Sequence, residues 1–165
     1  MRIWSKYALG VAVASVAFLC AAGSAQEKKD AGGHGIVHIA DLKWSPLIKG
    51  CDVASVNGDM NGDGSPFVIR LRCSAGTKIP AHWHPTDENV TVLKGVFQVG
   101  MGEKFDAAGL QTMNVGDLGS IPKETRHFAF SKTATVVQVH GVGPFKVNWV
   151  NLADVVPPDA PKTKM

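Results

Sequence analysis

The chain has 165 residues, enough for one folded domain around a single hydrophobic core. Its 17 Lys and Arg residues and 14 Asp and Glu residues give a net charge of +3, with no basic block of the kind that binds nucleic acid or membrane surfaces. The 18 Gly and 9 Pro residues favour many short strands joined by turns.

Residues 1–25 have the pattern of a secretory signal peptide. Arg2 and Lys6 form a basic start, residues 8–22 form an uncharged apolar run, and small residues at 23 and 25 precede Gln26. A membrane anchor is the alternative, but the run is short for a bilayer span. Cleavage would remove two basic residues and no acidic one, which leaves a net charge of +1. We therefore expect a bacterial-type periplasmic or secreted protein with no stable membrane span after cleavage.

Two cysteines remain in the cleaved chain, Cys51 and Cys73. In an oxidising compartment they could form a disulfide, which would close a loop of about 20 residues and stabilise the fold by roughly 3 kcal/mol. Two buried thiols are the alternative, because the sequence does not give the separation of the Cα atoms. Neither cysteine belongs to a C-x-x-C pair, so a thiol redox function is disfavoured.

The cleaved chain is predicted to be all-β. Residues 26–35 are charged and rich in glycine, which indicates a flexible lead-in to a domain over residues 36–150. The predicted strands are 36–40, 53–56, 67–72, 78–83, 89–93, 96–101, 117–121, 127–131, 135–140 and 145–150. A single turn is expected at 106–110, and residues 151–165, with three prolines, are expected to form a loose tail. Strands at this spacing favour a sandwich or a barrel.

Gly95 is predicted to supply the positive φ of a two-residue hairpin turn between the strands on either side. That pairing would place five apolar side chains on one inner face: Val90, Val92, Phe97, Val99 and Met101. These residues are first of all a barrel core. Any of them near a binding site would favour a ligand with an apolar or aromatic body.

A set of metal-binding residue types surrounds positions 82–88. Because side chains alternate along a strand, His82 and His84 point to the same face. Pro85 ends the strand and begins a turn that can return Glu88 to the two rings. A third imidazole must come from elsewhere in the fold, and His127 is best placed to supply it. Three imidazoles and a carboxylate suit Mn²⁺, Fe²⁺, Ni²⁺, Cu²⁺ or Zn²⁺.

The motifs that contain these residues resemble the two signature motifs of the cupin superfamily. Gly76-x₅-His82-x-His84-x₃-Glu88-x₆-Gly95 matches the first, and Gly116-x₅-Pro122-x-Glu124-x₂-His127-x₃-Ser131 matches the second with two departures. Glu124 stands where the family usually has Gly, and Ser131 where it usually has Asn. The resemblance covers residues 76–131 and implies a jelly-roll β-barrel. It also implies a divalent metal held by His82, His84, Glu88 and His127.

The resemblance does not select a reaction, because the same barrel hosts many chemistries. One hypothesis is an exported metal-dependent enzyme of dioxygenase, isomerase or lyase type, in which Glu88 ligates the metal or moves a proton. The alternatives are a non-catalytic metal- or ligand-binding barrel and an interaction protein without metal. We expect a small-molecule ligand or substrate as partner and no nucleic acid. The resemblance also favours a homodimer.

Two other features have simpler interpretations. Residues 59–64 imitate the opening of a calcium loop, but Arg70 stands at the twelfth position, where a bidentate Glu is required. A polar turn between strands is the better interpretation. Gln138 and His140 share one face of a predicted strand and would either reach the pocket or point outward.

Overall fold

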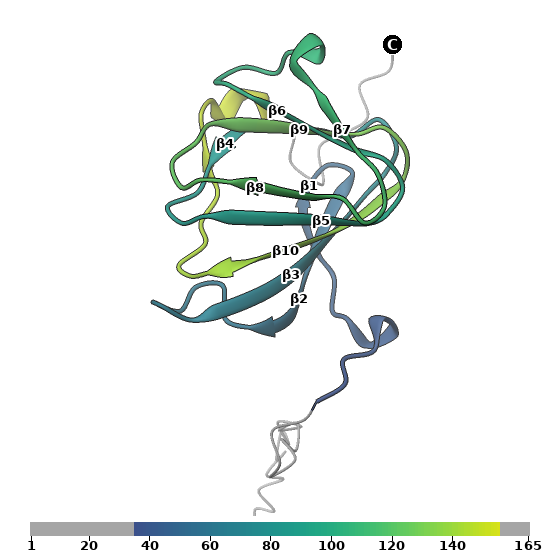
Figure 1. The fold of residues 1–165 in the computed structure, drawn as a ribbon, viewed down its shortest axis with the longest axis vertical. Coiled ribbons are helices and arrows are strands. Elements are labelled where there is room, and N and C mark those ends of the chain that lie inside the picture. Colours follow the sequence, from purple (N-terminus) through teal and green to yellow (C-terminus); the bar gives the residue numbers. More distant parts are fainter. Residues whose placement is uncertain (1–34, 156–165) are drawn as a thin grey trace, which may run out of the picture. The chain divides into compact units, whose positions relative to one another are not determined.

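Two antiparallel β-sheets fold into a barrel in the computed structural model, which describes residues 35–155 (Figure 1). The six-stranded sheet has the order β1 (Ser45–Ile48), β2 (Cys51–Gly58), β3 (Pro66–Cys73), β10 (Thr135–Val142), β5 (Glu88–Lys94), β8 (Leu118–Ile121). The five-stranded sheet has the order β11 (Asn148–Trp149), β4 (Lys78–Trp83), β9 (His127–Ser131), β6 (Phe97–Met101), β7 (Gln111–Met113). Because strands distant in sequence are neighbours in both sheets, the arrangement is a jelly roll, and the predicted all-β fold class is confirmed.

The inner faces of the two sheets form one hydrophobic core. Val137 and Val139 on β10 are each 1% exposed, while Gln138 between them is only half-buried. Phe97 and Ala129 face them from the five-stranded sheet and are also buried. Burying side chains of this size stabilises a fold by about 1.5–3 kcal/mol each, so the alternating pattern supplies most of the driving force for closing the barrel.

Three short 3₁₀ helices accompany the strands of the described residues: η1 (Ile39–Asp41), η2 (Ala107–Gly109) and η3 (Leu152–Asp154). The second confirms the turn predicted at 106–110. The first shows that the strand predicted over 36–40 is wrong. Ile36 is 85% exposed and Ile39 is 58% exposed, so these apolar residues have neither a neighbouring strand nor a core to cover them.

Three further strands differ from the prediction in their presence or length. β1 and β7 were not predicted, because one begins Ser45-Pro46 and the other has three residues, too few for a pattern. The strand predicted over 145–150 shrinks to the two residues of β11.

Gly95 joins the two sheets and does not close a hairpin. β5 pairs with β8 and β10, whereas β6 pairs with β7 and β9, so the predicted pairing of β5 with β6 is wrong. Gly95 has the expected positive φ of 78°. Four of the five side chains assigned to the inner face are buried, since both sheets face the same core. The exception is Met101, which is 53% exposed because β6 ends there.

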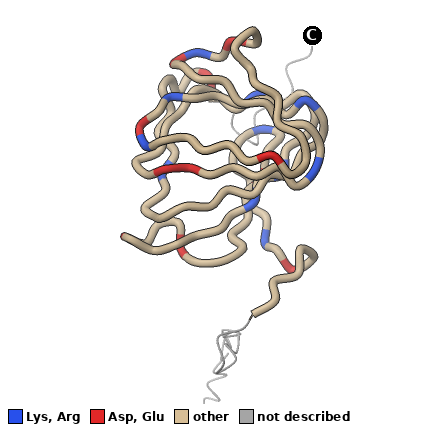
Figure 2. Tube along the Cα trace, in the orientation of Figure 1, with Lys and Arg blue, Asp and Glu red and all other residues tan. Residues whose placement is uncertain are grey.

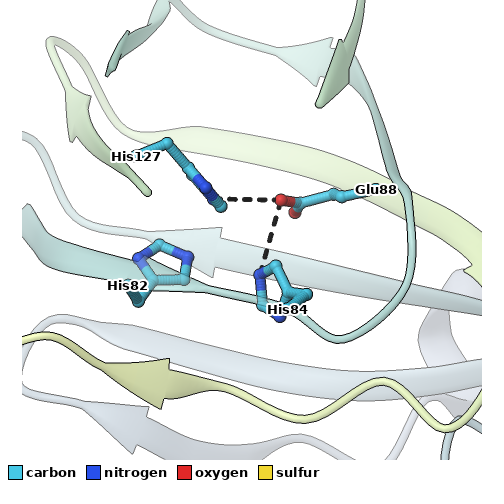
Figure 3. Close-up of side chains that lie close together, drawn as sticks. All are labelled: His82, His84, Glu88 and His127. Carbon is cyan, nitrogen blue, oxygen red and sulfur yellow. Dashed lines mark ion pairs between the residues drawn. The ribbon is translucent and has the colours of Figure 1, made fainter. Parts of the chain in front are cut away.

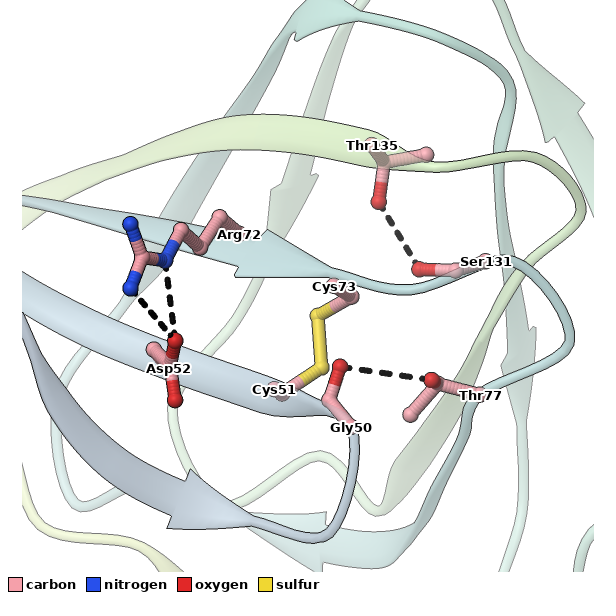
Figure 4. Close-up of a disulfide and its surroundings, with 8 residues drawn as sticks. All are labelled: Gly50, Cys51, Asp52, Arg72, Cys73, Thr77, Ser131 and Thr135. Carbon is pink, nitrogen blue, oxygen red and sulfur yellow. Dashed lines mark hydrogen bonds and ion pairs between the residues drawn. A yellow bond between two sulfur atoms is a disulfide. The ribbon is translucent and has the colours of Figure 1, made fainter.

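The disulfide left open by the sequence is present between Cys51 and Cys73, which lie directly opposite one another on β2 and β3 (Figure 4). Nearby, the buried hydroxyl of Ser131 forms a 2.8 Å hydrogen bond with Thr135 Oγ1. Ser131 occupies the motif position that usually holds Asn, and this hydrogen bond satisfies its shorter side chain. This end of the barrel is therefore closed by a covalent link and a satisfied polar pair.

Figure 2 shows segments of Lys and Arg residues interspersed with segments of Asp and Glu residues along the barrel. None of the helices in residues 35–155 is long and apolar enough to cross a bilayer. The predicted signal peptide, residues 26–34 of the lead-in and residues 156–165 of the tail lie outside the described residues. The domain boundaries at 35/36 and 150/151 stay predictions.

Candidate metal centre

Four side chains converge inside the barrel, as the motif spacing predicted (Figure 3). His82 on β4 and His127 on β9 are direct partners across the five-stranded sheet. Glu88 is the first residue of β5 in the opposite sheet, and His84 lies one residue beyond β4. Each side chain is 3–7% exposed, and their donor atoms all lie within 4.8 Å of one another. The cluster thus draws ligand-type atoms from both sheets to one buried point.

The turn after β4 brings Glu88 back to the histidines. Residues 84–87 are fastened to the turn that precedes β9 by two hydrogen bonds. Lys123 N donates to Asp87 Oδ1 (2.8 Å), and Glu124 N donates to His84 O (2.8 Å). Glu124, where the family usually has Gly, adopts a φ of 62°. A β-carbon is disfavoured in this conformation, so the chain carries local strain beside the cluster.

Each imidazole of the cluster is held by a backbone carbonyl. The three contacts are His82 Nδ1 to Pro80 O (2.7 Å), His84 Nδ1 to Lys146 O (2.8 Å) and His127 Nδ1 to Thr125 O (2.9 Å). Because a carbonyl oxygen only accepts, Nδ1 of each ring must donate. Each neutral ring therefore presents an unprotonated Nε2 to the centre, which is the tautomer of a metal-ligating histidine with an outer carbonyl partner.

The central atoms repel one another unless a proton or a metal ion lies between them. Glu88 Oε2 is 3.1 Å from His127 Nε2 and 3.4 Å from His84 Nε2. With both nitrogens unprotonated, lone pairs face lone pairs, and His84 Nε2 and Glu88 Oε2 have no hydrogen-bond partner despite their burial. These separations suit neighbouring donors on one transition-metal ion, whose bonds to nitrogen and oxygen are about 2.0–2.2 Å. The donor set therefore fits a metal.

Burial sets the protonation states that a metal needs. Burial, reinforced by the charge that His127 can carry, lowers the pKa of His82 to about 3. Burial also lowers the pKa of His84, against the opposing effect of Glu88. For Glu88, burial raises the pKa, but the contact with His127 and the positive charge that nearby imidazoles can carry outweigh it, and the pKa is lowered. At neutral pH two neutral imidazoles and a carboxylate are thus available for ligation.

The structure adds residues to the site that the sequence did not reveal. The Phe145 ring stacks on His84, with centroids 3.9 Å apart and planes at 17°. The Trp149 ring lies 5.3 Å from His82, its partner across β4 and β11. Together with the Lys146 carbonyl, these rings orient two of the imidazoles. No motif marks residues 145–149, because their role depends on a chain separation of about 60 residues.

Gln138 and His140 do not join the site. They alternate with Val137 and Val139, whose side chains fill the core, so the outward-facing alternative is correct. Gln138 Oε1 accepts hydrogen bonds from the Arg70 side chain. At residues 59–64, Asn61 N donates to Asp59 Oδ1 within a turn, which supports the interpretation as a polar turn.

The cluster lines a cavity of about 90 Å³ between the two sheets. Its wall is formed by inward-facing side chains of both sheets, together with Phe145, Val147 and Trp149. A small molecule in this cavity would lie directly against the four donor atoms.

Comparison with known proteins connects this architecture to a family. The model of the ChrR cupin-like domain family matches residues 33–146, and no curated protein matches significantly. KdgF from a Halomonas species has a similar structure (TM-score 0.54, 15% identity, 66% of this chain and 94% of that one covered). The polyketide cyclase RemF from Streptomyces resistomycificus also has a similar structure (TM-score 0.58, 18% identity, 73% of this chain and 88% of that one covered). A third similar structure is that of a putative acetylacetone dioxygenase from Methylibium petroleiphilum (TM-score 0.55, 19% identity, 77% of this chain and 86% of that one covered). At these identities the likeness shows a shared fold.

Proposed function

Because the chain belongs to the family of ChrR cupin-like domains, we propose that it is an exported, metal-dependent cupin enzyme acting on a small organic molecule. His82, His84, His127 and Glu88 would hold one divalent ion of Mn, Fe, Ni, Cu or Zn. The observation that supports this most strongly is the buried meeting of three imidazoles, each with Nδ1 held by a backbone carbonyl, and one carboxylate, in which His84 Nε2 and Glu88 Oε2 have no hydrogen-bond partner.

A bound ion would supply Lewis acidity to an oxygen atom of the substrate and, for iron, manganese or copper, one-electron redox chemistry. The protein would supply orientation and a dry surrounding. Four protein ligands leave two positions on a six-coordinate ion, as a dioxygenase, isomerase or lyase needs. Glu88 would ligate the ion throughout or release it to move a proton to or from the substrate.

Export is proposed from residues 1–25, and one observation fits it. The disulfide between Cys51 and Cys73 is of the kind that persists in oxidising compartments such as the periplasm. Both cysteines are buried, so it is a structural bond and not an exposed redox pair. A homodimer remains an expectation of the family resemblance.

A non-catalytic barrel is the second candidate, and one feature favours it. The four donor side chains are 3–7% exposed, and Phe145 covers one face of His84. A metal enclosed in this way could stabilise the barrel or anchor a ligand without turnover.

Metal analysis and turnover assays separate these functions. Protein purified without chelator should contain about one equivalent of transition metal, and His127→Ala should lose it. The matched control is His38→Ala, which removes an exposed histidine outside the cluster. Protein loaded with each metal is then tested for O₂ uptake and for conversion of phenols and keto acids. Absence of metal from the wild type after anaerobic reconstitution overturns the proposal. Bound metal without turnover supports the non-catalytic barrel.

A further inference from the structure

The cavity beside the cluster has an almost wholly apolar wall. Twenty side chains line it, and those outside the cluster are all aliphatic, aromatic or thioether-bearing. Ile69, Val137 and Val139 belong to one sheet, and Ile79 and Phe97 to the other. The indole N–H of Trp149 is the only further polar side-chain group in this wall.

Glu88 is the exception in a lining that, within residues 35–155, otherwise lacks charged side chains. Among the described residues, no Lys, Arg or Asp side chain and no hydroxyl or amide side chain lines the cavity, and Glu88 is its only charged group. The half-buried side chains of the wall, which include Leu47, Val53, Met60 and Leu71, are apolar as well. A carboxylate, phosphate or polyhydroxyl group of a ligand would find there, besides the metal, only the single indole N–H of Trp149.

We infer that the ligand of this site is a compact molecule with an apolar body and one chelating pair of oxygen atoms, and that these oxygen atoms are bound by the metal. This inference rests on the proposed function, since it assigns all polar recognition to an ion bound by the cluster. Enolised β-diketones and alkyl catechols belong to this class. Sugars, sugar acids and phosphorylated compounds do not, because their remaining polar groups would be buried without hydrogen-bond partners.

The size of the cavity limits the class further. About 90 Å³ accommodates a handful of water molecules, so the body of the ligand is a short alkyl chain or a single ring. Such a body gains affinity by leaving water for a wall of Val, Ile, Leu and Phe side chains.

This inference is tested with two ligands that share the metal-chelating oxygen pair and differ in one other substituent. 4-Methylcatechol and 3,4-dihydroxybenzoate offer the same oxygen pair, but one carries a methyl group where the other carries a carboxylate. The protein is loaded with Zn²⁺, which is redox-inert, and metal content is measured first. Isothermal titration then gives both dissociation constants. 4-Methylcatechol should bind at least about 100-fold more tightly, because the carboxylate would be buried without a partner.

A variant of the cavity wall sharpens the test. Met60→Lys places a cation at the half-buried edge of the wall and should strengthen binding of 3,4-dihydroxybenzoate by about tenfold. Met101→Lys adds the same charge at an exposed methionine outside the cavity and should change the affinity for neither ligand.

The outcomes are distinct. Failure of the wild type to bind any of the five divalent metals overturns the proposed function and this inference with it, and a wild type that binds another of these metals but not Zn²⁺ is titrated with that metal. If Zn²⁺ binds, then equal affinity for the two catechols, a preference for the carboxylate, or no binding of either overturns the inference alone. The wild-type comparison decides even if Met60→Lys fails to fold.

Discussion

The two ends of β9 both bury polar side chains, but these side chains are paired in different ways at the two ends. At one end Ser131 is buried and shares a hydrogen bond with Thr135, close to the disulfide that links β2 and β3. At the other end His127 is buried against Glu88, with nitrogen and carboxylate lone pairs facing one another. The disulfide end is complete with protein atoms alone. The cluster end leaves His84 Nε2 and Glu88 Oε2 buried without hydrogen-bond partners, and a bound cation would satisfy both atoms.

The largest expected effect is metal stabilisation of the cluster end. At a free metal concentration 1,000 times the dissociation constant, binding should raise the free energy of unfolding by about 4 kcal/mol. Urea unfolding with and without chelator measures this gain. In His127→Ala this metal-dependent gain should disappear. The free energy of unfolding measured in chelator should differ much less between the variant and the wild type. An equal metal-dependent gain in the variant would show that the ion binds elsewhere.

At the disulfide end, the double variant Cys51→Ala/Cys73→Ala should lower the free energy of unfolding by about 3 kcal/mol, because the unfolded chain loses its closed loop. Metal affinity should stay unchanged, since neither cysteine touches the cluster. Urea unfolding and metal titration of the same sample test both statements. A tenfold loss of metal affinity would mean that the two ends are coupled.

Acid should weaken the metal-free protein through His82. Its pKa is about 3 when folded and 6.5 when unfolded, so between these values the unfolded state binds more protons. Stability is therefore fully present above pH 6.5 and falls as the pH drops. From pH 6.5 to pH 5 the loss should be about 2 kcal/mol. Chemical unfolding in the presence of chelator measures this loss. His82→Gln should remove the part of the pH dependence of the unfolding free energy that His82 causes. A slope that persists unchanged in the variant would assign it to other groups.

The smallest expected effect comes from the strained turn beside the cluster. Glu124→Gly should stabilise the protein by about 1 kcal/mol, because glycine adopts a φ of 62° without penalty. Lys123→Gly is the matched control, since Lys123 is an exposed neighbour without a positive φ, and it should destabilise slightly. Thermal unfolding compares the two variants. Stabilisation by both would point to a cause other than the backbone angle.

Local patterns were sufficient for much of the fold. β4 and β9 have the predicted bounds. The order of the strands was not predictable from local patterns. Gly95 has the same positive φ in a hairpin and in a crossing between sheets, so only the partners of β5 and β6 distinguish the two. Residues 36–40 show the converse error, an apolar run that finds no core.

The sequence by itself determined the donor set and its rough placement. Alternation puts His82 and His84 on one face, and the motif spacing nominates Glu88 and His127. Tertiary structure alone decided what surrounds them: the Lys146 carbonyl, the rings of Phe145 and Trp149, and an apolar cavity. The physical reason is distance along the chain. A strand's period is local, but which strand lies opposite, and which carbonyl meets an imidazole, depends on how the whole sheet rolls up.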